Sequence, residues 1–227
     1  AGGRVQHRAA ARGAAASAVS AVEPGAAPSR AATSGFNVTT FNVLAGCYKR
    51  VKRADGSVAM ESEFLEQAVA RQARVVAMLT DLAPSVMCLQ EFWHASPEVN
   101  ALYTEGLRAA GYAMFVTPRT GNRPDGLLTA VRMEDFDVVD RRDILFNDCG
   151  DRVATLLHLR PKSGKSGGVS GGASGSAALG DMLLVNTHLL FPHNSNSTLI
   201  RLRESFKILE YLHEYQERMV GEAVEGS

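Results

Sequence analysis

The sequence is poor in cysteine and in aromatic residues, and it contains no long apolar run. Its 227 residues include three cysteines and one tryptophan, and aromatic side chains make up 7%. Cys47, Cys88 and Cys149 are irregularly spaced and none lies in a Cys-x-x-Cys pair, so we interpret them as reduced thiols rather than as a disulfide framework or a zinc site. No apolar stretch approaches the roughly 20 residues that cross a bilayer, so we expect no membrane span.

The sequence also has no excess charge of either sign. It contains 24 lysines and arginines and 24 aspartates and glutamates, and 45% of its residues are hydrophobic. This composition excludes a chain that is disordered throughout, and it excludes a strongly basic coat for nucleic acid. Any polyanion must therefore be bound by a local site.

Two stretches of low complexity stand apart from the rest of the chain. Residues 1–35 lack aromatic side chains and hold one acid, Glu23, against four arginines. An arginine- and serine-bearing, acid-poor leader predicts an organelle transit peptide, for a chloroplast or another organelle; the alternative is a disordered tail on a cytoplasmic protein. Residues 162–180, which are rich in glycine and serine, predict a flexible surface loop between two strands.

The rest of the chain alternates between strand and helix patterns. Apolar runs predict strands at 38–45, 85–91, 112–117, 127–132, 136–146, 153–159 and 182–190. Helical spacing of apolar residues predicts helices at 64–82, 98–110 and 198–219. In the last helix one stripe is expected to pack on a sheet, namely Leu199, Leu202, Phe206, Leu209 and Leu212. Mixed order of this kind predicts an α/β (α+β) layered sandwich.

Polar residues occur within or at the ends of three of the predicted strands. Asn42 lies in the apolar segment FNVTTFNVLAG, and Glu91 ends VMCLQEFW. Asn186 and His188 are two residues apart in LLVNTHLLF, so their side chains project from one face of a strand. Each residue alone has an ordinary structural explanation, such as a satisfied hydrogen bond, a turn or a place in the core. Together they favour a site at the rim of a sheet.

These segments occur in a recognisable order. TFNVLAG is followed by CLQEFW, DGLLTAVR, NTHLLFP and then RLRE at the start of the last helix. In this order they resemble the endonuclease/exonuclease/phosphatase superfamily, which has the fold of deoxyribonuclease I, from about Phe36 to about Met219. The residues within these motifs most resemble those of the deadenylase-like and nocturnin-like branch, and those of plant and green-algal members of which some carry EF-hands downstream. The resemblance implies two mixed β-sheets flanked by helices, formed by residues 36–227.

The resemblance also implies roles at the metal and the reacting phosphate. Glu91 matches the superfamily's magnesium-binding glutamate, and Asn42 the asparagine that helps to position metal and phosphate. Mg²⁺ is the implied cofactor, with Mn²⁺ as an alternative. Asn186 and His188 match the catalytic Asn-x-His pair beside the scissile phosphate.

Further residues match positions that face the substrate. Asp125, with Gly126, matches a turn that opens a strand lining the substrate groove. Arg152 falls where relatives have substrate-facing polar residues. Arg201 matches the basic residue of an Arg-x-x-Gln element, although Glu204 stands where the superfamily often has glutamine.

Two motifs of the superfamily, GDxN and a late SDH, do not occur in this sequence. We therefore expect an incomplete domain that lacks its carboxyl-terminal part and is inactive alone. For the full-length protein the resemblance implies a metal-dependent hydrolase of phosphodiester bonds, acting on a phosphate ester such as a nucleotide or single-stranded nucleic acid. The alternatives are an inactive scaffold that serves as a binding or assembly subunit, and a phosphatase for a small phosphorylated molecule.

Overall fold

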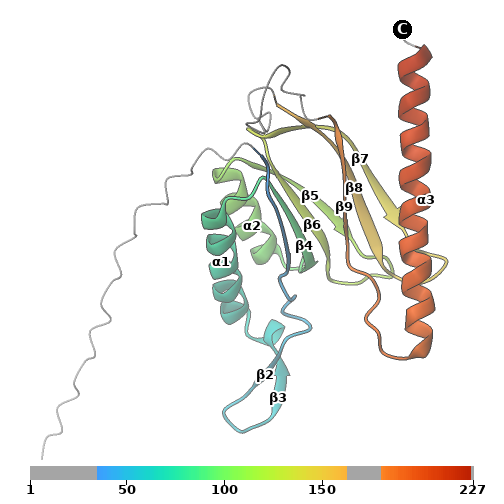
Figure 1. Ribbon diagram of the computed structural model, residues 1–227. Helices are drawn as coiled ribbons and strands as arrows, with labels where there is room; N and C mark the ends of the chain where they lie inside the picture. Colours follow the sequence, from blue (N-terminus) through green and yellow to red (C-terminus); the bar gives the residue numbers. More distant parts are fainter. Residues whose placement is uncertain (1–34, 163–179, 226–227) are drawn as a thin grey trace, which may run out of the picture. The chain divides into compact units, whose positions relative to one another are not determined.

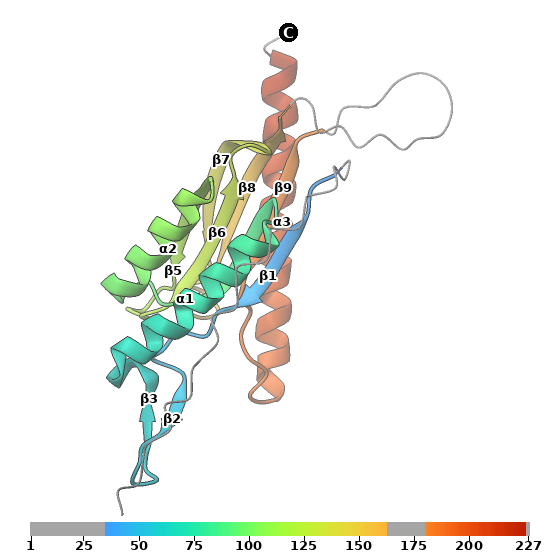
Figure 2. The same ribbon diagram turned by 90° about the vertical axis from the view of Figure 1, so that its left-hand side faces the viewer.

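The computed structural model describes residues 35–162 and 180–225, and these form layers of helix, sheet, sheet and helix (Figures 1 and 2). The expected α/β layered sandwich is confirmed. Residues 1–34 of the predicted leader and 163–179 of the predicted loop lie outside the described residues.

The first sheet has four strands in the order β1-β4-β6-β5. They are β1 (Val38–Asn42), β4 (Val86–Phe92), β6 (Gly126–Arg132) and β5 (Tyr112–Pro118). β1 runs parallel to β4, whereas β4 and β5 run antiparallel to β6. One face is covered by α1 (Leu65–Leu82) and α2 (Pro97–Ala109), through a core that includes Leu79, Leu89 and Tyr103.

The second sheet has three strands in the order β7-β8-β9, namely β7 (Phe136–Leu145), β8 (Val153–Pro161) and β9 (Met182–Thr187). All of its pairings are antiparallel, so the prediction that both sheets are mixed is wrong for this one among the described residues. The two sheets pack through apolar side chains such as Cys88, Val131 and Leu157. The alternation of buried residues along β8 disappears because both of its faces are covered.

A short hairpin that the sequence did not predict follows β1. It comprises β2 (Arg50–Lys52) and β3 (Val58–Met60), which pair antiparallel, and the 3₁₀ turn η1 (Glu61–Glu63) comes directly after it. Its strands are three residues long, with β2 reading Arg-Val-Lys and β3 Val-Ala-Met, so they are too short to show an alternation from which a strand could be inferred.

The predicted helix boundaries agree closely with the structure where backbone signals end the helix. α1 ends at Leu82, and Ala83 follows in the left-handed conformation (φ 44°) before Pro84, which disfavours a helical residue ahead of it. α2 begins after Ser96, whose hydroxyl accepts a hydrogen bond from the Val99 amide. Among the helices of the described residues, none combines the length and the apolar character needed to cross a membrane.

The last helix, α3 (Ser195–Glu225), packs on the second sheet by a different face from the one predicted. Leu212 does contact the sheet, but Leu199, Leu202, Phe206 and Leu209 are 60–65% exposed. The buried face is set by Tyr215, whose hydroxyl lies 3.1 Å from His158 Nδ1 and donates to Asp140 at 3.2 Å. Helical periodicity identifies an apolar stripe, but the hydrogen bonds of Tyr215 determine which side of α3 packs on the sheet.

A pair of leucine substitutions tests this orientation. Leu157→Ala removes a fully buried side chain between the sheets and is expected to lower the free energy of unfolding by about 2 to 5 kcal/mol. Leu209→Ala makes the same chemical change on the exposed face of α3 and is expected to alter it by less than about 0.5 kcal/mol. Urea denaturation of both variants provides the measurement, and equal losses would contradict the orientation of α3.

Candidate functional site

Glu91 occupies a distorted position at the carboxyl end of β4. The pairing of β4 with β6 shifts between Gln90 and Phe92, and Glu91 has a positive φ of 54°. Such a bulge turns a side chain away from the direction that regular alternation would give it. A left-handed conformation is costly for a residue with a β-carbon, and such strain often accompanies a functional position.

Asn42 lies across from Glu91 at the end of β1 and orients it. The Asn42 amide nitrogen donates to Glu91 Oε1 at 2.9 Å, while Asn42 Oδ1 accepts from the Leu44 amide at 2.9 Å. Helix α1 supports this corner, because Arg71 donates to the carbonyl oxygens of Val43 and Leu44 at 2.9 and 2.6 Å. Asn42 therefore orients the carboxylate, and its own oxygen is held by the Leu44 amide.

His188 comes from the second sheet, just beyond β9, and faces Glu91. Its Nε2 lies 4.0 Å from Glu91 Oε1, and its Nδ1 lies 3.2 Å from Arg152 Nη1. Because a guanidinium can only donate, Nδ1 is the acceptor and the proton of the neutral imidazole is on Nε2, toward Glu91. Burial, and then the positive charge of Arg152, lower the pKa of His188 below its ordinary value.

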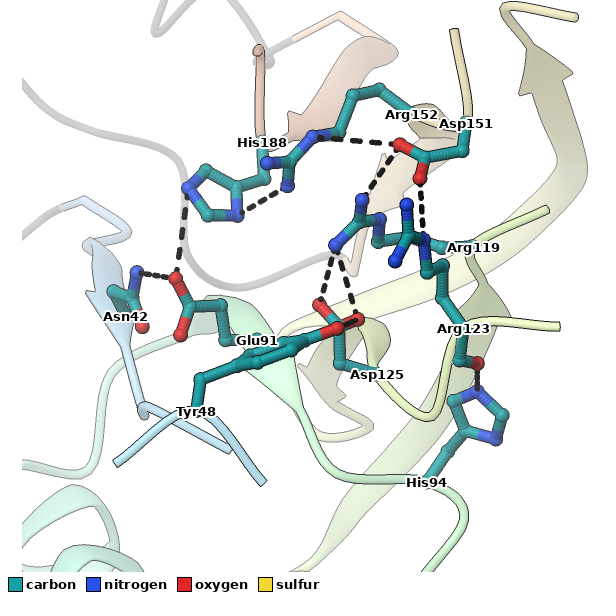
Figure 3. A network of polar contacts seen from close by, with 10 residues as sticks. All are labelled: Asn42, Tyr48, Glu91, His94, Arg119, Arg123, Asp125, Asp151, Arg152 and His188. Carbon is teal, nitrogen blue, oxygen red and sulfur yellow. Dashed lines mark hydrogen bonds and ion pairs between the residues drawn. The ribbon is translucent and has the colours of Figure 1, made fainter. Parts of the chain in front are cut away.

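Behind these residues lies a network of arginines and aspartates (Figure 3). Arg119 donates to Asp125 at 3.1 Å and to Asp151 at 2.6 Å, and Arg123 donates to the other oxygen of Asp151 at 2.6 Å. Burial would lower the pKa of Arg119, but the hydrogen bond to Asp151 and the charges of both aspartates raise it. The network therefore holds the largely buried Arg119 guanidinium in its charged form.

Tyr48 closes the side of this network nearest to hairpin β2–β3. Its hydroxyl donates to Asp125 at 2.8 Å. Burial and this hydrogen bond raise the pKa of Tyr48 to about 12. Gly126 follows Asp125, and a β-carbon there would lie 2.4 Å from the Thr117 carbonyl oxygen, so this turn requires glycine.

Asn186 is placed differently from the prediction. It is 2% exposed, and its amide nitrogen donates to Leu128 O at 3.3 Å and to Thr129 Oγ1 at 3.1 Å. Its oxygen accepts from Gln90 at 2.9 Å. The prediction that Asn186 contacts the reacting phosphate is therefore corrected: its side chain is committed to joining β9 to the first sheet.

The structure gathers most, but not all, of the residues that the sequence singled out. Asn42, Glu91, Asp125, Arg152 and His188 belong to one constellation (Figure 3). Asp125 is fully buried and is bound by Tyr48 and Arg119, so it holds these neighbours in place instead of facing a substrate directly. Arg201 is exposed on α3 and donates to the Leu190 carbonyl oxygen at 3.4 Å, outside this network.

Sequence reasoning missed Tyr48, Arg119, Arg123 and Asp151. They lie in turns and at strand ends without a recurring spacing, and charged residues in such places are ordinary. The signal that was present is the density of charge in 118–125 and 148–152, two segments that flank predicted strands.

The carboxylate of Glu91 offers one oxygen that could bind a hydrated magnesium ion. Glu91 Oε2 is buried and has no hydrogen-bond partner among the described residues, so one hard carboxylate oxygen is available. Magnesium in proteins is often held by one or two carboxylates and keeps several waters. Among the described residues no group of three or more histidines, cysteines or acids could hold a metal ion.

The contact between Arg152 and His188 generates a titration test. Arg152→Met removes the neighbouring positive charge and is expected to raise the pKa of His188 toward its ordinary value, although burial keeps it lowered in part. NMR titration of the imidazole measures the shift, with Arg108→Met on the exposed side of α2 as the control.

The lowered pKa of His188 also determines how this residue makes stability depend on pH. Since the folded state binds the His188 proton less readily than the unfolded state, the contribution of this group to stability falls as the pH drops below the ordinary histidine range. A His188 pKa that is unchanged or lower in Arg152→Met would contradict the contact.

Asn186 generates a stability test. Asn186→Ala leaves buried groups of Gln90 and Thr129 without their partner and is expected to lower the free energy of unfolding by about 2 to 4 kcal/mol. Asn147→Ala, in an exposed turn, is the matched control and should change stability little. Similar denaturation midpoints for the two variants would argue against Asn186 as a link between the sheets.

The chain is similar in sequence to a plant protein. An uncharacterized calcium-binding protein of Arabidopsis thaliana is 42% identical over 188 residues, which are 81% of this chain and 37% of that protein. The chain therefore spans well under half the length of this relative. No protein-family model matches the sequence.

Solved structures give a broader likeness. The human nocturnin catalytic domain, with a bound sulfate anion, matches 80% of this chain and 59% of its own at a TM-score of 0.54 and 18% identity. ANGEL2, a 2′,3′-cyclic phosphatase in complex with adenosine-2′,3′-vanadate, matches 74% of this chain and 45% of its own at 0.51 and 21% identity. With its layered sheets and ordered motifs, the chain has the deoxyribonuclease-I-like fold of the endonuclease/exonuclease/phosphatase superfamily.

Proposed function

We propose that this protein is a metal-dependent hydrolase of phosphodiester bonds whose site is centred on Glu91 and His188. The observation that carries the proposal is the free, buried oxygen of Glu91 beside a neutral histidine and buried arginines, at one end of the sheets. The fold shared with a 2′,3′-cyclic phosphatase supports a phosphoester as the substrate.

The arginines would bind the anionic phosphoryl group. Arg152 is 9% exposed and Arg119 shows 11% of its side chain, so both charges are largely removed from water. Charge-assisted hydrogen bonds to phosphate are stronger in such a setting than at an exposed surface. Because Asp125 and Asp151 hold Arg119 in place, little side-chain order has to be gained when the substrate binds.

His188 would act as a donor to the phosphoryl oxygens. Its Nε2 carries the proton in the neutral form and points toward Glu91, while Arg152 fixes the opposite nitrogen. A preorganised donor is most useful where charge develops in the transition state. The lowered pKa keeps the histidine neutral at pH 7, so this arrangement of donor and acceptor is retained.

Glu91 is the residue that would hold the metal ion, which we propose to be Mg²⁺ or Mn²⁺. When bound, the cation neutralises phosphoryl charge and favours attack by water. Asn42 would keep the carboxylate turned toward the site through its 2.9 Å hydrogen bond, leaving Oε2 for the metal.

The substrate that we propose is a nucleotide or a single-stranded nucleic acid. ANGEL2 was solved with an adenosine ligand, which supports a nucleotide. The net charge of this chain is zero, whereas binding of duplex DNA usually relies on many phosphate contacts. A small local site suits a single strand better.

A second candidate function is binding without catalysis. Its support is that Asp125 and Asp151, the aspartates of the network, are both paired with arginines, so neither is a free base for an attacking water. A phosphate-binding scaffold would need the arginines and His188 but no such base. The two candidates differ in whether phosphate binding is followed by turnover.

Substitution of Glu91 distinguishes them. In the catalytically competent protein, Glu91→Gln is expected to lower magnesium-dependent hydrolysis of a phosphodiester by about 100-fold or more, because it removes the charge that holds the cation. It should also weaken Mn²⁺ binding measured by electron paramagnetic resonance. Glu105→Gln, an exposed acid on α2, is the control for loss of one carboxylate.

The remaining outcomes decide between the candidates. Mn²⁺ binding and turnover that are unchanged by Glu91→Gln would exclude Glu91 as the metal ligand. Phosphate binding that depends on Arg152, without turnover in any divalent metal ion, would favour the scaffold.

A further inference from the structure

We propose that hairpin β2–β3 is a binding arm for single-stranded nucleic acid and guides the strand toward the candidate site. The choice of partner rests on the proposed function, since the site is taken to act on a phosphoester. The arm itself is argued from its position and its charges.

The hairpin begins and ends beside the site. The chain enters it from Tyr48, whose hydroxyl binds Asp125 in the network. It returns at Glu61, which binds Lys49 at 2.7 Å and Arg71 at 2.7 Å. Figure 1 shows the hairpin projecting from the end of the sheet at which β1 and β4 finish. A ligand along the hairpin would therefore meet the site at its base.

One face of the hairpin carries uncompensated positive charge. Lys49 pairs with Glu61 and Arg53 with Glu63, so these cations are neutralised. Arg50 and Lys52 are exposed and form no ion pair or hydrogen bond with the residues that the structure describes. Being two apart in β2, they project from the same face, with about 7 Å between their backbones.

Apolar side chains lie beside these two cations. Arg50 pairs with Met60 and Lys52 with Val58 across the hairpin. Met60 is 36% and Val58 is 59% exposed. Cations next to open apolar surface suit a single strand, whose phosphates meet the charges while its bases contact apolar groups or stack on arginine.

The acid at the tip of the hairpin does not cancel this charge directly. Asp55 accepts hydrogen bonds from the Ser57 amide at 2.9 Å and from the Ser57 hydroxyl at 2.7 Å, which hold it within the turn. Arg50, the nearer of the two free cations to Tyr48, is five residues from Asp55 along the chain. Arg50 therefore lies at the base of the arm, beside the site, and Lys52 at the end of β2 next to the turn.

Other polyanions fit less well. Duplex DNA usually engages many phosphates, and two free cations on a three-residue strand provide few contacts. A lipid surface would require a larger apolar face or a second anchor than Val58 and Met60 supply. A single strand fits the small number and linear arrangement of the charges.

The salt dependence of binding tests the arm. The full chain is titrated into a fluorescein-labelled single-stranded RNA of twelve nucleotides, and fluorescence anisotropy is followed at several salt concentrations. The double variant Arg50→Ala/Lys52→Ala should reduce the slope of log K against log salt by about 1.4, or about 0.7 for each lost phosphate contact. Arg74→Ala/Arg108→Ala, on α1 and α2, removes the same charge and should leave the slope unchanged.

A charge-preserving variant separates charge from folding. Arg50→Lys/Lys52→Arg should keep the slope of the unmodified chain, and the thermal unfolding midpoints of all variants should agree. Equal slopes for the alanine variant and the unmodified chain would overturn the proposal. So would loss of binding to vesicles containing phosphatidylserine without loss of binding to RNA, which would identify a lipid surface as the partner.

Hydrolysis and the salt dependence of RNA binding distinguish an error in the binding-arm proposal from an error in the proposed function. Hydrolysis of adenosine 2′,3′-cyclic phosphate needs no contact with the arm, so Arg50→Ala/Lys52→Ala should retain it while Glu91→Gln loses it. If no metal ion supports hydrolysis by the full-length protein but the slope still falls by about 1.4, the binding arm is supported and the hydrolase proposal fails. If hydrolysis depends on Glu91 and the slope is unchanged, the arm is wrong and the hydrolase proposal stands.

Discussion

The buried amide of Asn186 is the interaction on which the arrangement of the site depends. It belongs to the second sheet, but it bonds to Gln90, Leu128 and Thr129 of the first. An amide in an apolar interface is stable only when its donors and acceptor are paired, and this requirement permits a single register between the sheets. His188, two residues further along, is thereby brought opposite Glu91, which belongs to the other sheet.

Electrostatic compensation within the site complements this link. Asp125 and Asp151 offset the burial of Arg119, and Arg123 shares Asp151. Arg152 instead contacts a neutral histidine, and the nearest oxygen of Asp151 is 4.0 Å from its Nε, beyond hydrogen-bonding distance. Its charge is therefore the least compensated of the three. An anion that reaches the space between Arg152 and Glu91 finds a guanidinium whose hydrogen-bonding capacity is only partly used.

The sequence predicted the elements with strong periodicity and the residues at strand ends, but not their surroundings. β4 begins with four apolar residues, Val86 to Leu89, and Glu91 stands near the end of the strand, so both the strand and its special residue could be inferred. The orientation of α3 could not be, because its exposed stripe is as apolar as the buried one and the choice rests on Tyr215 meeting Asp140, 75 residues earlier. Tyr48 and Arg119 escaped prediction for the same reason. Both side chains belong to the site because they donate to Asp125, and no spacing pattern in the sequence indicates that contact.

At Glu91 the left-handed backbone conformation favours glycine, whereas the proposed chemistry requires a carboxylate. A residue with a β-carbon pays on the order of 1 to 2 kcal/mol for such a conformation, whereas glycine adopts it freely. If selection acted on folding alone, glycine would therefore be expected to replace Glu91. Related chains that keep the fold but lack the proposed activity should show glycine first at this position, before any change in Asn186, whose hydrogen bonds the fold itself needs.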